Sequence, residues 1–368
     1  MKIELKPIIL LLLILFSTSN SQAQEAKDTI AWNQKPTIEF SGFVDIFYAY
    51  DFNQPTGNIR QPFLYNHNRQ NEFNLNVGFL KIAVKNPQYR ANLALQAGTY
   101  AQDNYAAEPS MLRTIFEANV GISISKKNRL WLDAGIFSSH IGFESAISSD
   151  NWTLTRSILA ENSPYYLSGA KLTFQPNSKW EMAALVLNGW QRIQRLPGNS
   201  IPSFGTQLKF APSKKITLNW STFIGTDDPD SLRRMRYFNN FYGQLQLSKR
   251  IGLIAGFDVG FQQKTKNTNQ YNSWYSPVLI AQFKLTNTWK TALRAEYYDD
   301  QKNTLVSAGK NKGFQVYGLS WNFDFSPAEN ITWRLEARHF SSSKEVFSSK
   351  SGLLRSDFFL CTSLAIKF

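Results

Sequence analysis

The chain has 368 residues, of which 14% are aromatic and 18% are charged, and its formal net charge is +13. Its single cysteine, Cys361, cannot form an internal disulfide, so a disulfide-stabilised scaffold is excluded and Cys361 is expected to be a packing residue. A basic excess of this size suits nucleic acid, lipopolysaccharide, phospholipid head groups or anionic solutes as partners.

The first 23 residues have the pattern of a secretory signal peptide. Lys2 and Lys6 give a basic start, residues 8–16 form an unbroken apolar run, and Ser21-Gln22-Ala23 is a small-residue cleavage pattern. The mature chain is predicted to begin near Gln24, with residues 24–36 as a periplasmic N-terminal segment. No stretch reaches the roughly 20 apolar residues of a membrane helix, which excludes a helical membrane protein. Export also leaves little access to nucleic acid.

Residues 37–368 contain about sixteen segments of roughly ten residues in which apolar and polar side chains alternate. In the first segment Ile38, Phe40, Val44, Ile46, Tyr48 and Tyr50 share one face, and Glu39, Ser41, Asp45 and Asp51 share the other. A later segment places Phe116, Ala118, Val120, Ile122 and Ile124 opposite Glu117, Asn119 and Ser123. The apolar faces are almost free of charge, as expected where a charge facing lipid costs roughly 2 to 4 kcal/mol. The pattern predicts a transmembrane antiparallel up-and-down β-barrel.

The segment near residues 72–84 breaks the alternation. Phe73, Leu75 and Val77 lead into Leu80 with a one-residue slip at Gly78. A β-bulge adds one residue to one strand of a pair, so a bulge at Gly78 would explain the slip.

Short turns and long polar loops alternate between the predicted strands. Turns are predicted near residues 85–88, 125–128, 175–179, 211–215, 248–250, 286–288 and 326–330, and loops near 52–71, 101–112, 138–165, 191–202, 226–239, 264–273, 301–312 and 342–353. This order closes a sixteen-strand meander with both chain ends on the turn side. Bacterial outer-membrane barrels place short turns in the periplasm and long loops outside.

Aromatic residues on the apolar faces gather near the turns. They are Phe174, Trp180, Phe210, Trp289, Trp321 and Trp333. Such a group fits an interfacial girdle in a membrane, and the core of a secreted soluble β-sandwich is the alternative. The last strand runs from about Asp357 to Phe368, and its terminal aromatic residue resembles the recognition signal of the bacterial barrel-insertion machinery.

The sequence predicts no enzyme activity, metal site or cofactor. His67 and His140 lie in predicted loops and His339 at a strand end, and only His140 stands near serines, Ser138 and Ser139. A Ser-His hydrolase would also need a third orienting group, so surface histidines are the simpler interpretation.

One acidic loop stretch, residues 227–230, resembles a calcium-binding loop but lacks its Gly and bidentate Glu. The neighbouring Arg233, Arg234 and Arg236 could bind lipopolysaccharide phosphates or pair with these acids. Both interpretations stay open.

Charged residues on the polar faces are the candidates for the lining of a pore. They are Asp45, Glu117, Asp133, Asp258, Arg294, Glu296, Arg334, Glu336 and Arg338. The last five lie on adjoining strands and would place opposite charges across a narrow aqueous passage. The alternative is a structural ion-pair network, and the two roles are compatible.

The longest loop, residues 138–165, mixes apolar and charged side chains. A wholly solvated loop would not need its apolar residues, so part of it is predicted to fold into the barrel and narrow the channel. The candidate constriction residues are Glu144, Asp150, Trp152 and Arg156.

The same loop carries a resemblance to a known family. Its motifs are Ile141-Gly142-Phe143-Glu144, Asp150-Asn151-Trp152, Thr155-Arg156-Ser157 and Ser163-Pro164-Tyr165-Tyr166, followed by Ser168-Gly169-Ala170 and Asn188-Gly189-Trp190. They look like the central signature of the β-barrel porin-2 family, also described as OmpL-like porins, which is common in Bacteroidota. The resemblance covers nearly the whole mature chain and implies a porin-like channel in the outer membrane of a Gram-negative bacterium. It implies no catalytic or ligand residues.

We therefore expect an outer-membrane channel for passive diffusion of small hydrophilic solutes, surrounded by lipid and lipopolysaccharide, with its positive charge favouring anions. The alternative is a non-transporting surface barrel, an adhesin or structural protein, that binds partners through its long loops. The sequence does not distinguish a monomer from a homo-oligomer.

Overall fold

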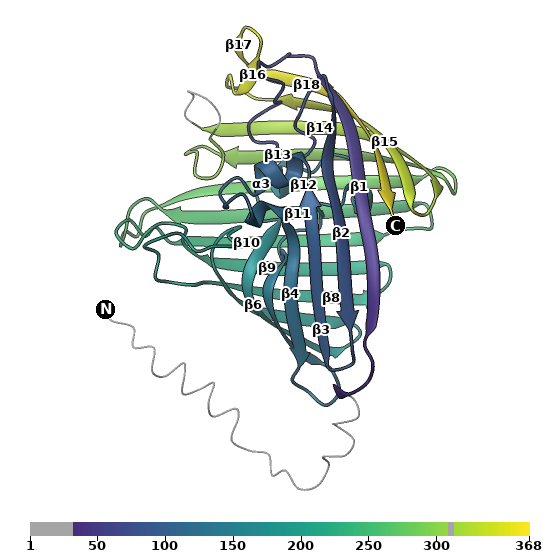
Figure 1. Ribbon diagram of the computed structural model, residues 1–368. Helices are drawn as coiled ribbons and strands as arrows, with labels where there is room; N and C mark the ends of the chain where they lie inside the picture. Colours follow the sequence, from purple (N-terminus) through teal and green to yellow (C-terminus); the bar gives the residue numbers. More distant parts are fainter. Residues whose placement is uncertain (1–31, 308–312) are drawn as a thin grey trace.

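The computed structural model describes residues 32–307 and 313–368, and it shows a closed barrel (Figure 1). The predicted signal peptide, residues 1–23, and the predicted start near Gln24 lie outside the described residues. Of the predicted N-terminal segment, the described part reaches the turn end of the barrel, where the Trp32 ring stacks on Tyr89 at 6.3 Å. Within the described ranges, no helix is long and apolar enough to cross a membrane.

The barrel wall is an antiparallel meander of sixteen strands, which confirms the predicted architecture. The strands are β1 (Thr37–Asp51), β2 (Phe73–Lys85), β3 (Tyr89–Ala97), β4 (Ile115–Ser123), β5 (Leu130–Ser138), β6 (Tyr166–Asn177), β7 (Trp180–Leu187), β8 (Ser203–Ser213), β9 (Ile216–Gly225), β10 (Arg236–Gln246), β11 (Ile251–Gln263), β12 (Tyr271–Lys284), β13 (Trp289–Asp300), β14 (Phe314–Ala328), β15 (Ile331–Ser341) and β18 (Ser356–Lys367). The short strands β16 (Phe347–Ser349) and β17 (Gly352–Leu354) form a separate hairpin in the last loop.

Connections at the two ends of the barrel differ in length. Seven turns of two to six residues join strands at one end, and eight loops of seven to 27 residues join them at the other. The loops contain the helices α3 (Thr99–Asn104) and α4 (Ile158–Glu161) and the 3-10 turns η1 (Leu112–Thr114) and η2 (Ser148–Asp150). The predicted alternation of turns and loops is confirmed.

The barrel closes where the first strand pairs with the last (Figure 1). Register pairs run from Phe43 with Lys367 to Asp51 with Phe359. Beyond them, Gly42 N donates to Phe368 O at 2.7 Å and Phe368 N donates to Gly42 O at 3.0 Å. A closed sheet leaves no exposed strand edge, which is a requirement for crossing lipid.

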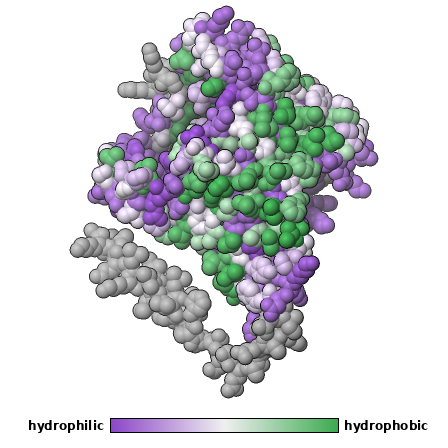
Figure 2. Space-filling model, viewed as in Figure 1, coloured by the Kyte–Doolittle hydropathy of each residue, from purple (hydrophilic) through white to green (hydrophobic). Residues whose placement is uncertain are grey.

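The alternation of side chains places the predicted apolar faces outside. Phe40 is 76% exposed on the outer surface, whereas Asp45 on the same strand is fully buried inside. Figure 2 shows hydrophobic residues gathered over the middle of the barrel wall, with hydrophilic residues toward its ends. This surface excludes the soluble sandwich, whose apolar rings would lie in a core. Cys361 faces inward and is buried without a disulfide.

The bulge predicted at Gly78 lies two residues earlier. On β1, Asp45 pairs with Val77 and Ile46 pairs with Leu75, so Asn76 is the extra residue. The bulge turns both Asn76 and Val77 inward, where the Asn76 side chain accepts a hydrogen bond from His67 N at 3.0 Å. The predicted outward position of Val77 is therefore wrong.

A second bulge, on β4, was not predicted. Ala94 pairs with Glu117 and Leu95 with Ile115, which leaves Phe116 as the extra residue. Phe116 stacks on the inward-facing Phe79 with ring centroids 4.6 Å apart. Phe116 thus lies inside the barrel and not on the predicted apolar face.

Most of the predicted girdle is in place at the turn end. Phe174, Trp289 and Trp333 are 41%, 37% and 38% exposed on the outer surface. Trp180 and Phe210 pack together there at 4.3 Å. Trp321 instead lies in the middle of β14, where its indole N–H is satisfied by Thr291 Oγ1 at 2.9 Å.

Candidate pore and its constriction loop

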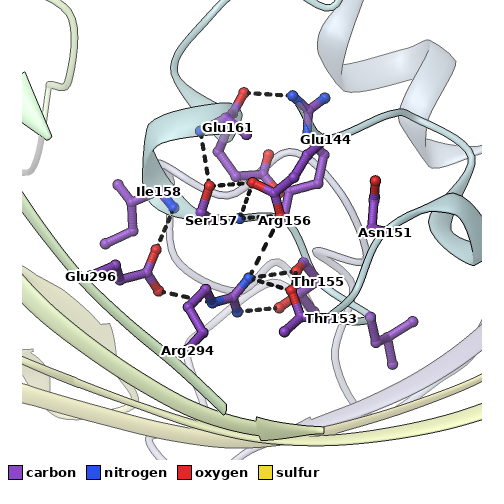
Figure 3. Close-up of polar contacts among 12 residues, drawn as sticks. Glu144, Asn151, Thr153, Thr155, Arg156, Ser157, Ile158, Glu161, Arg294 and Glu296 are labelled. Carbon is purple, nitrogen blue, oxygen red and sulfur yellow. Dashed lines mark hydrogen bonds and ion pairs between the residues drawn. The ribbon is translucent and has the colours of Figure 1, made fainter. Parts of the chain in front are cut away.

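The loop between β5 and β6, residues 139–165, folds into the barrel as predicted. We call it the constriction loop. Its residues 153–158 run along the inner wall and lie close to Arg294 and Glu296 of β13 (Figure 3). Leu154, Ile158 and Leu159 of the loop are at most 1% exposed. Apolar residues in this polar loop are thus explained by burial inside the lumen.

Four charged residues of β13 and β15 hold the centre of the constriction loop. Arg294 donates to Thr155 O at 2.7 Å and to Glu336 Oε1 at 2.5 Å. Glu336 accepts from Thr155 N at 2.6 Å, and Arg338 donates to Glu296 at 2.5 Å. Two guanidinium groups balance two carboxylates, which offsets the cost of burying charge. The network also satisfies backbone groups of an irregular segment that would otherwise be buried without partners.

The start of helix α4 belongs to the same network. Glu296 Oε2 accepts from Ile158 N at 2.7 Å, and Arg338 donates to Arg156 O at 2.8 Å. The N-cap of α4 is Ser157, whose hydroxyl oxygen accepts from Ala160 N at 3.3 Å.

The tip of the constriction loop reaches the turn end of the barrel. Arg334 of β15 donates to the backbone oxygens of Ser148 and of Asn151, the latter at 3.0 Å. The same guanidinium pairs with Asp324 of β14 at 2.7 Å. Asp150 pairs with Lys367 near the end of β18. The loop therefore extends down the lumen and is fixed at both its centre and its tip.

Charges within the constriction loop also pair with each other. Glu144 accepts hydrogen bonds from the backbone and hydroxyl of Ser157. Burial raises the pKa of Glu144, against the opposing effect of Arg294 and Arg156. The Arg156 guanidinium lies over the Tyr165 ring at 3.3 Å, a cation–π contact.

Glycines on the inner wall make room for the rings of the loop. A Cβ at Gly252 of β11 would lie 2.5 Å from the Trp152 ring, and one at Gly256 would lie 2.7 Å from Phe143. On β8, a Cβ at Gly205 would lie 2.8 Å from the ring of His140. Glycine within a strand often marks such a close approach.

His140 is a buried structural residue. Its Nε2 lies 2.9 Å from Thr222 O, and burial lowers its pKa to about 4. His67, in the loop between β1 and β2, lies 2.8 Å from Asp45. His339 is exposed on the outer face of β15. Among the described residues, no three His, Cys, Asp or Glu side chains are grouped so as to hold a metal ion.

Two further loops, residues 52–72 and 98–114, also fill the lumen, which the sequence analysis missed. Glu161 of the constriction loop accepts from Tyr65 N at 2.9 Å. Tyr105 of the second loop stacks on Tyr166 at 3.9 Å. The available signal was the one used for residues 138–165, because these loops also contain apolar residues such as Phe63 and Tyr100, both 1% exposed.

Most of the predicted pore-lining residues face the interior but lie beneath these loops. The exposed fractions are at most 6% for Asp45, Asp258, Arg294, Glu296, Arg334, Glu336 and Arg338. Asp258 accepts from Asn240 at 2.6 Å, and Asn240 in turn accepts from Gly142 N of the constriction loop at 3.0 Å. Six of these seven residues bind loop backbone or side-chain groups directly, and Asp258 acts through Asn240, so they anchor loops in place of lining an open wall.

The remaining two predicted residues lie on the opposite wall, formed by strands β2–β8, where Glu117 is half-buried and Asp133 is buried. Glu117 pairs with Lys81 at 2.6 Å, and Asp133 with Arg90 at 2.6 Å. Lys171 and Lys209 face the interior on the same wall and are half-buried.

Two polar cavities border the constriction loop, and a third lies apart from it. A cavity of about 210 Å³ is lined by Phe116, Glu144 and Arg156 among others. One of about 500 Å³ at the turn end is lined by Asp150, Trp152, Lys290, Asp324 and Lys367. A third, of about 350 Å³ at the loop end, is lined by Asp227, Asp228, Arg234, Arg236 and Lys302.

In the acidic loop, the arginines pair with the acids. Arg234 donates to both oxygens of Asp228, at 2.8 and 2.9 Å, and this lowers the pKa of Asp228. Arg233 lies 2.6 Å from Asp230, and hydrogen bonds from Ser200 and Arg233 lower the pKa of Asp230 to about 2. The ion-pair interpretation thus accounts for this cluster.

The family model described as "Putative beta-barrel porin-2, OmpL-like" matches residues 37–368, which is the whole barrel. The chain belongs to this family. Membership confirms the resemblance seen in the loop motifs and, with the closed barrel, places the protein in the bacterial outer membrane as a porin-type channel. No curated protein matches the chain by sequence.

Solved porin structures share the fold of this family member at low sequence identity. The anion-selective porin from Comamonas acidovorans is 9% identical with a TM-score of 0.60, over 91% of this chain and 100% of that one. The outer membrane channel DcaP of Acinetobacter baumannii is 10% identical with a TM-score of 0.58, over 91% and 98%. Salmonella typhi OmpF, solved with daunomycin, is 8% identical with a TM-score of 0.59, over 90% and 98%. At these identities the likeness concerns the fold.

Proposed function

We propose that this porin-2 family member is a passive diffusion channel for small hydrophilic solutes, narrowed by the constriction loop, and not an enzyme. The main supporting observation is that the centre of the loop, residues 153–158, is attached to one side of the barrel. Strands β13–β15 bind the loop through Arg294, Glu336 and Arg338, while the β2–β8 wall keeps charged side chains toward the interior. A passage along that wall would expose solutes to polar groups on one side and to the loop on the other.

Removing the tip of the constriction loop tests this function. Deleting residues 146–156 should raise single-channel conductance in planar bilayers, because these residues fill the lumen from its centre to the turn end. A matched control is deletion of residues 265–269, which lie at the exposed end of the β11–β12 loop. An unchanged conductance in the first variant would refute the constriction.

The proposed passage should favour anions. Strands β2–β8 carry an excess of two positive charges: Lys81, Lys85, Arg90, Lys171 and Lys209 against Glu117, Asp133 and Glu181. Lys85 pairs with Glu39 of the neighbouring strand β1. A transverse field of this sign raises the local concentration of anions. Reversal potentials in a salt gradient measure the preference, and a clear cation preference would contradict it.

A second candidate is a non-transporting surface barrel that binds partners through its loops. The observation that favours it is the filling of the lumen by three loops, with Tyr100 and Tyr105 at most 1% exposed. This function predicts no stepwise conductance from the purified protein in bilayers. It also predicts that deleting residues 146–156 opens a conductance that the intact chain lacks.

We also propose three partners: lipopolysaccharide at the loop end, a second copy of the chain, and the barrel-insertion machinery. The machinery would recognise the last strand, which ends in Phe368. Truncation of Phe368 should slow barrel assembly in cells. Cross-linking in native membranes would detect the second copy as a discrete band of higher mass.

A further inference from the structure

The turn end of the barrel is far more basic than the loop end. The seven turns contain eight basic residues and one acidic residue, Glu329. We call the eight the basic turn ring, and they are Lys126, Lys127, Arg129, Lys179, Lys214, Lys215, Lys249 and Arg250. The described loop residues hold 14 basic and ten acidic residues, which is close to balance.

The protein itself does not neutralise the basic turn ring. All eight side chains are exposed. In residues 32–307 and 313–368, none of the eight forms an ion pair within 4.0 Å, whereas Arg233 and Arg234 at the loop end pair with Asp230 and Asp228. Eight like charges on one rim repel each other, so an external anion would stabilise this arrangement.

The ring stands directly beside the edge of the apolar surface. Lys179 precedes Trp180 of the girdle, and Arg250 precedes Ile251, which is 39% exposed on the outer wall. Leu247, 62% exposed, lies in the same turn as Arg250. Figure 2 shows hydrophilic residues bordering the hydrophobic middle of the wall. Long basic side chains at this depth reach the head-group layer while their carbon stems stay on apolar surface.

We propose that the basic turn ring binds the phosphate groups of anionic phospholipids in the leaflet at the turn end, which in bacterial barrels faces the periplasm. Each basic side chain near an anionic membrane surface adds attraction that decays within a Debye length of about 10 Å at 0.1 M salt. The ring would hold the barrel at a fixed depth and select its neighbouring lipids. This role goes beyond the proposed channel and is independent of it, because a barrel with a closed lumen would bind the same lipids.

Quenching of tryptophan fluorescence by brominated lipids tests the proposal. Trp220, Trp289, Trp321 and Trp333 face lipid and report on the chains beside the barrel. The full chain is placed in phosphatidylcholine nanodiscs with brominated phosphatidylglycerol or brominated phosphatidylcholine. The preference for the anionic lipid should be about fivefold at low salt and should approach one at about 0.5 M salt.

Two variants that lose the same number of charges test whether the turn lysines cause the preference for anionic lipid. Changing Lys126, Lys127, Lys214 and Lys215 to Gln should lower it at least by half, whereas changing Lys264, Lys266, Lys302 and Lys350 of the loops to Gln should leave it unchanged. Heat-modifiable migration on a gel checks that both variants are folded. Equal quenching by the two lipids in the unmodified protein, or an equal loss in both variants, would overturn the proposal. The proposal would also be overturned by a turn variant that loses anion permeability but keeps its lipid preference, because the basic turn ring would then attract anionic solutes and not lipids.

Discussion

Arg294 of β13 and Glu336 of β15 form a buried ion pair at 2.5 Å, and both side chains also bind Thr155 of the constriction loop. β14 lies between these two strands in the sheet, so the ion pair crosses the inner face of β14, where the constriction loop covers it. Neither charge is solvated, and each depends on the other and on the loop backbone. The pair therefore couples the position of the loop to the integrity of the wall.

Changing Glu336 to Gln should release the constriction loop. Removing one partner of a buried pair leaves the other charge uncompensated, at a cost of about 3 kcal/mol or more. We expect a lower unfolding midpoint in detergent, noisier channel currents and faster protease cleavage near residues 146–156. Glu117→Gln is the control, because its pair with Lys81 is partly exposed and should change stability by less than about 1 kcal/mol. Equal behaviour of the two variants would contradict the anchoring role.

Changing Gly252 to Val should displace Trp152. The new Cβ would lie 2.5 Å from the indole ring, so the loop or the strand must shift, and overpacking of this kind costs roughly 1 to 3 kcal/mol. The expected result is a change in tryptophan emission together with a lower unfolding midpoint. Gly78→Ala provides the comparison, since a Cβ there meets only ordinary contacts of 3.5 Å or more. If Trp152 emission and stability stay the same, the ring does not pack on Gly252.

The strands could be predicted because the signal is local. Each wall residue faces either lipid or the interior, so a period of two appears directly in the sequence, as for Phe40 and Asp45. The bulges at Asn76 and Phe116 shift this period by one residue, and their positions depend on inward contacts with His67 and Phe79. Broken alternation therefore indicated the first bulge near its place, but the exact position of a bulge depends on contacts with other segments, which the local pattern does not show.

The role of the interior charges could be predicted only in part. Alternation shows that Arg294 and Arg338 face inward, but it does not show that Thr155 and Arg156 cover them. Gly252 and Gly256 leave room for rings of the loop, but the sequence does not show which residues of the loop use this space. The sequence alone therefore does not distinguish pore-lining charges from a structural ion-pair network.

Changing Gly42 to Ala should weaken closure of the barrel. Gly42 faces the outside at the seam, and a Cβ there would lie 2.4 Å from the ring of Phe368, which packs on it. The ring would have to move away while its backbone keeps both hydrogen bonds to Gly42. We expect slower assembly into the heat-modifiable form, measured by the gel shift over time. When the purified chain refolds into detergent without the insertion machinery, Gly42→Ala combined with Phe368→Ala should assemble as fast as Phe368→Ala alone. A slower double variant would show that the clash is not the cause.

Stability should fall on mild acidification because of His140. Burial lowers its pKa to about 4 from the usual value of 6.5, so the unfolded chain takes up a proton at pH values where the folded protein does not. The stabilisation is complete above pH 6.5 and is lost as the pH falls toward 4, by up to roughly 3 kcal/mol. His140→Gln should flatten this part of the dependence of the unfolding free energy on pH, whereas His339→Gln, on the exposed outer face, should leave it unchanged. A slope between pH 4 and 6.5 that persists in the His140 variant would assign the acid sensitivity to other groups.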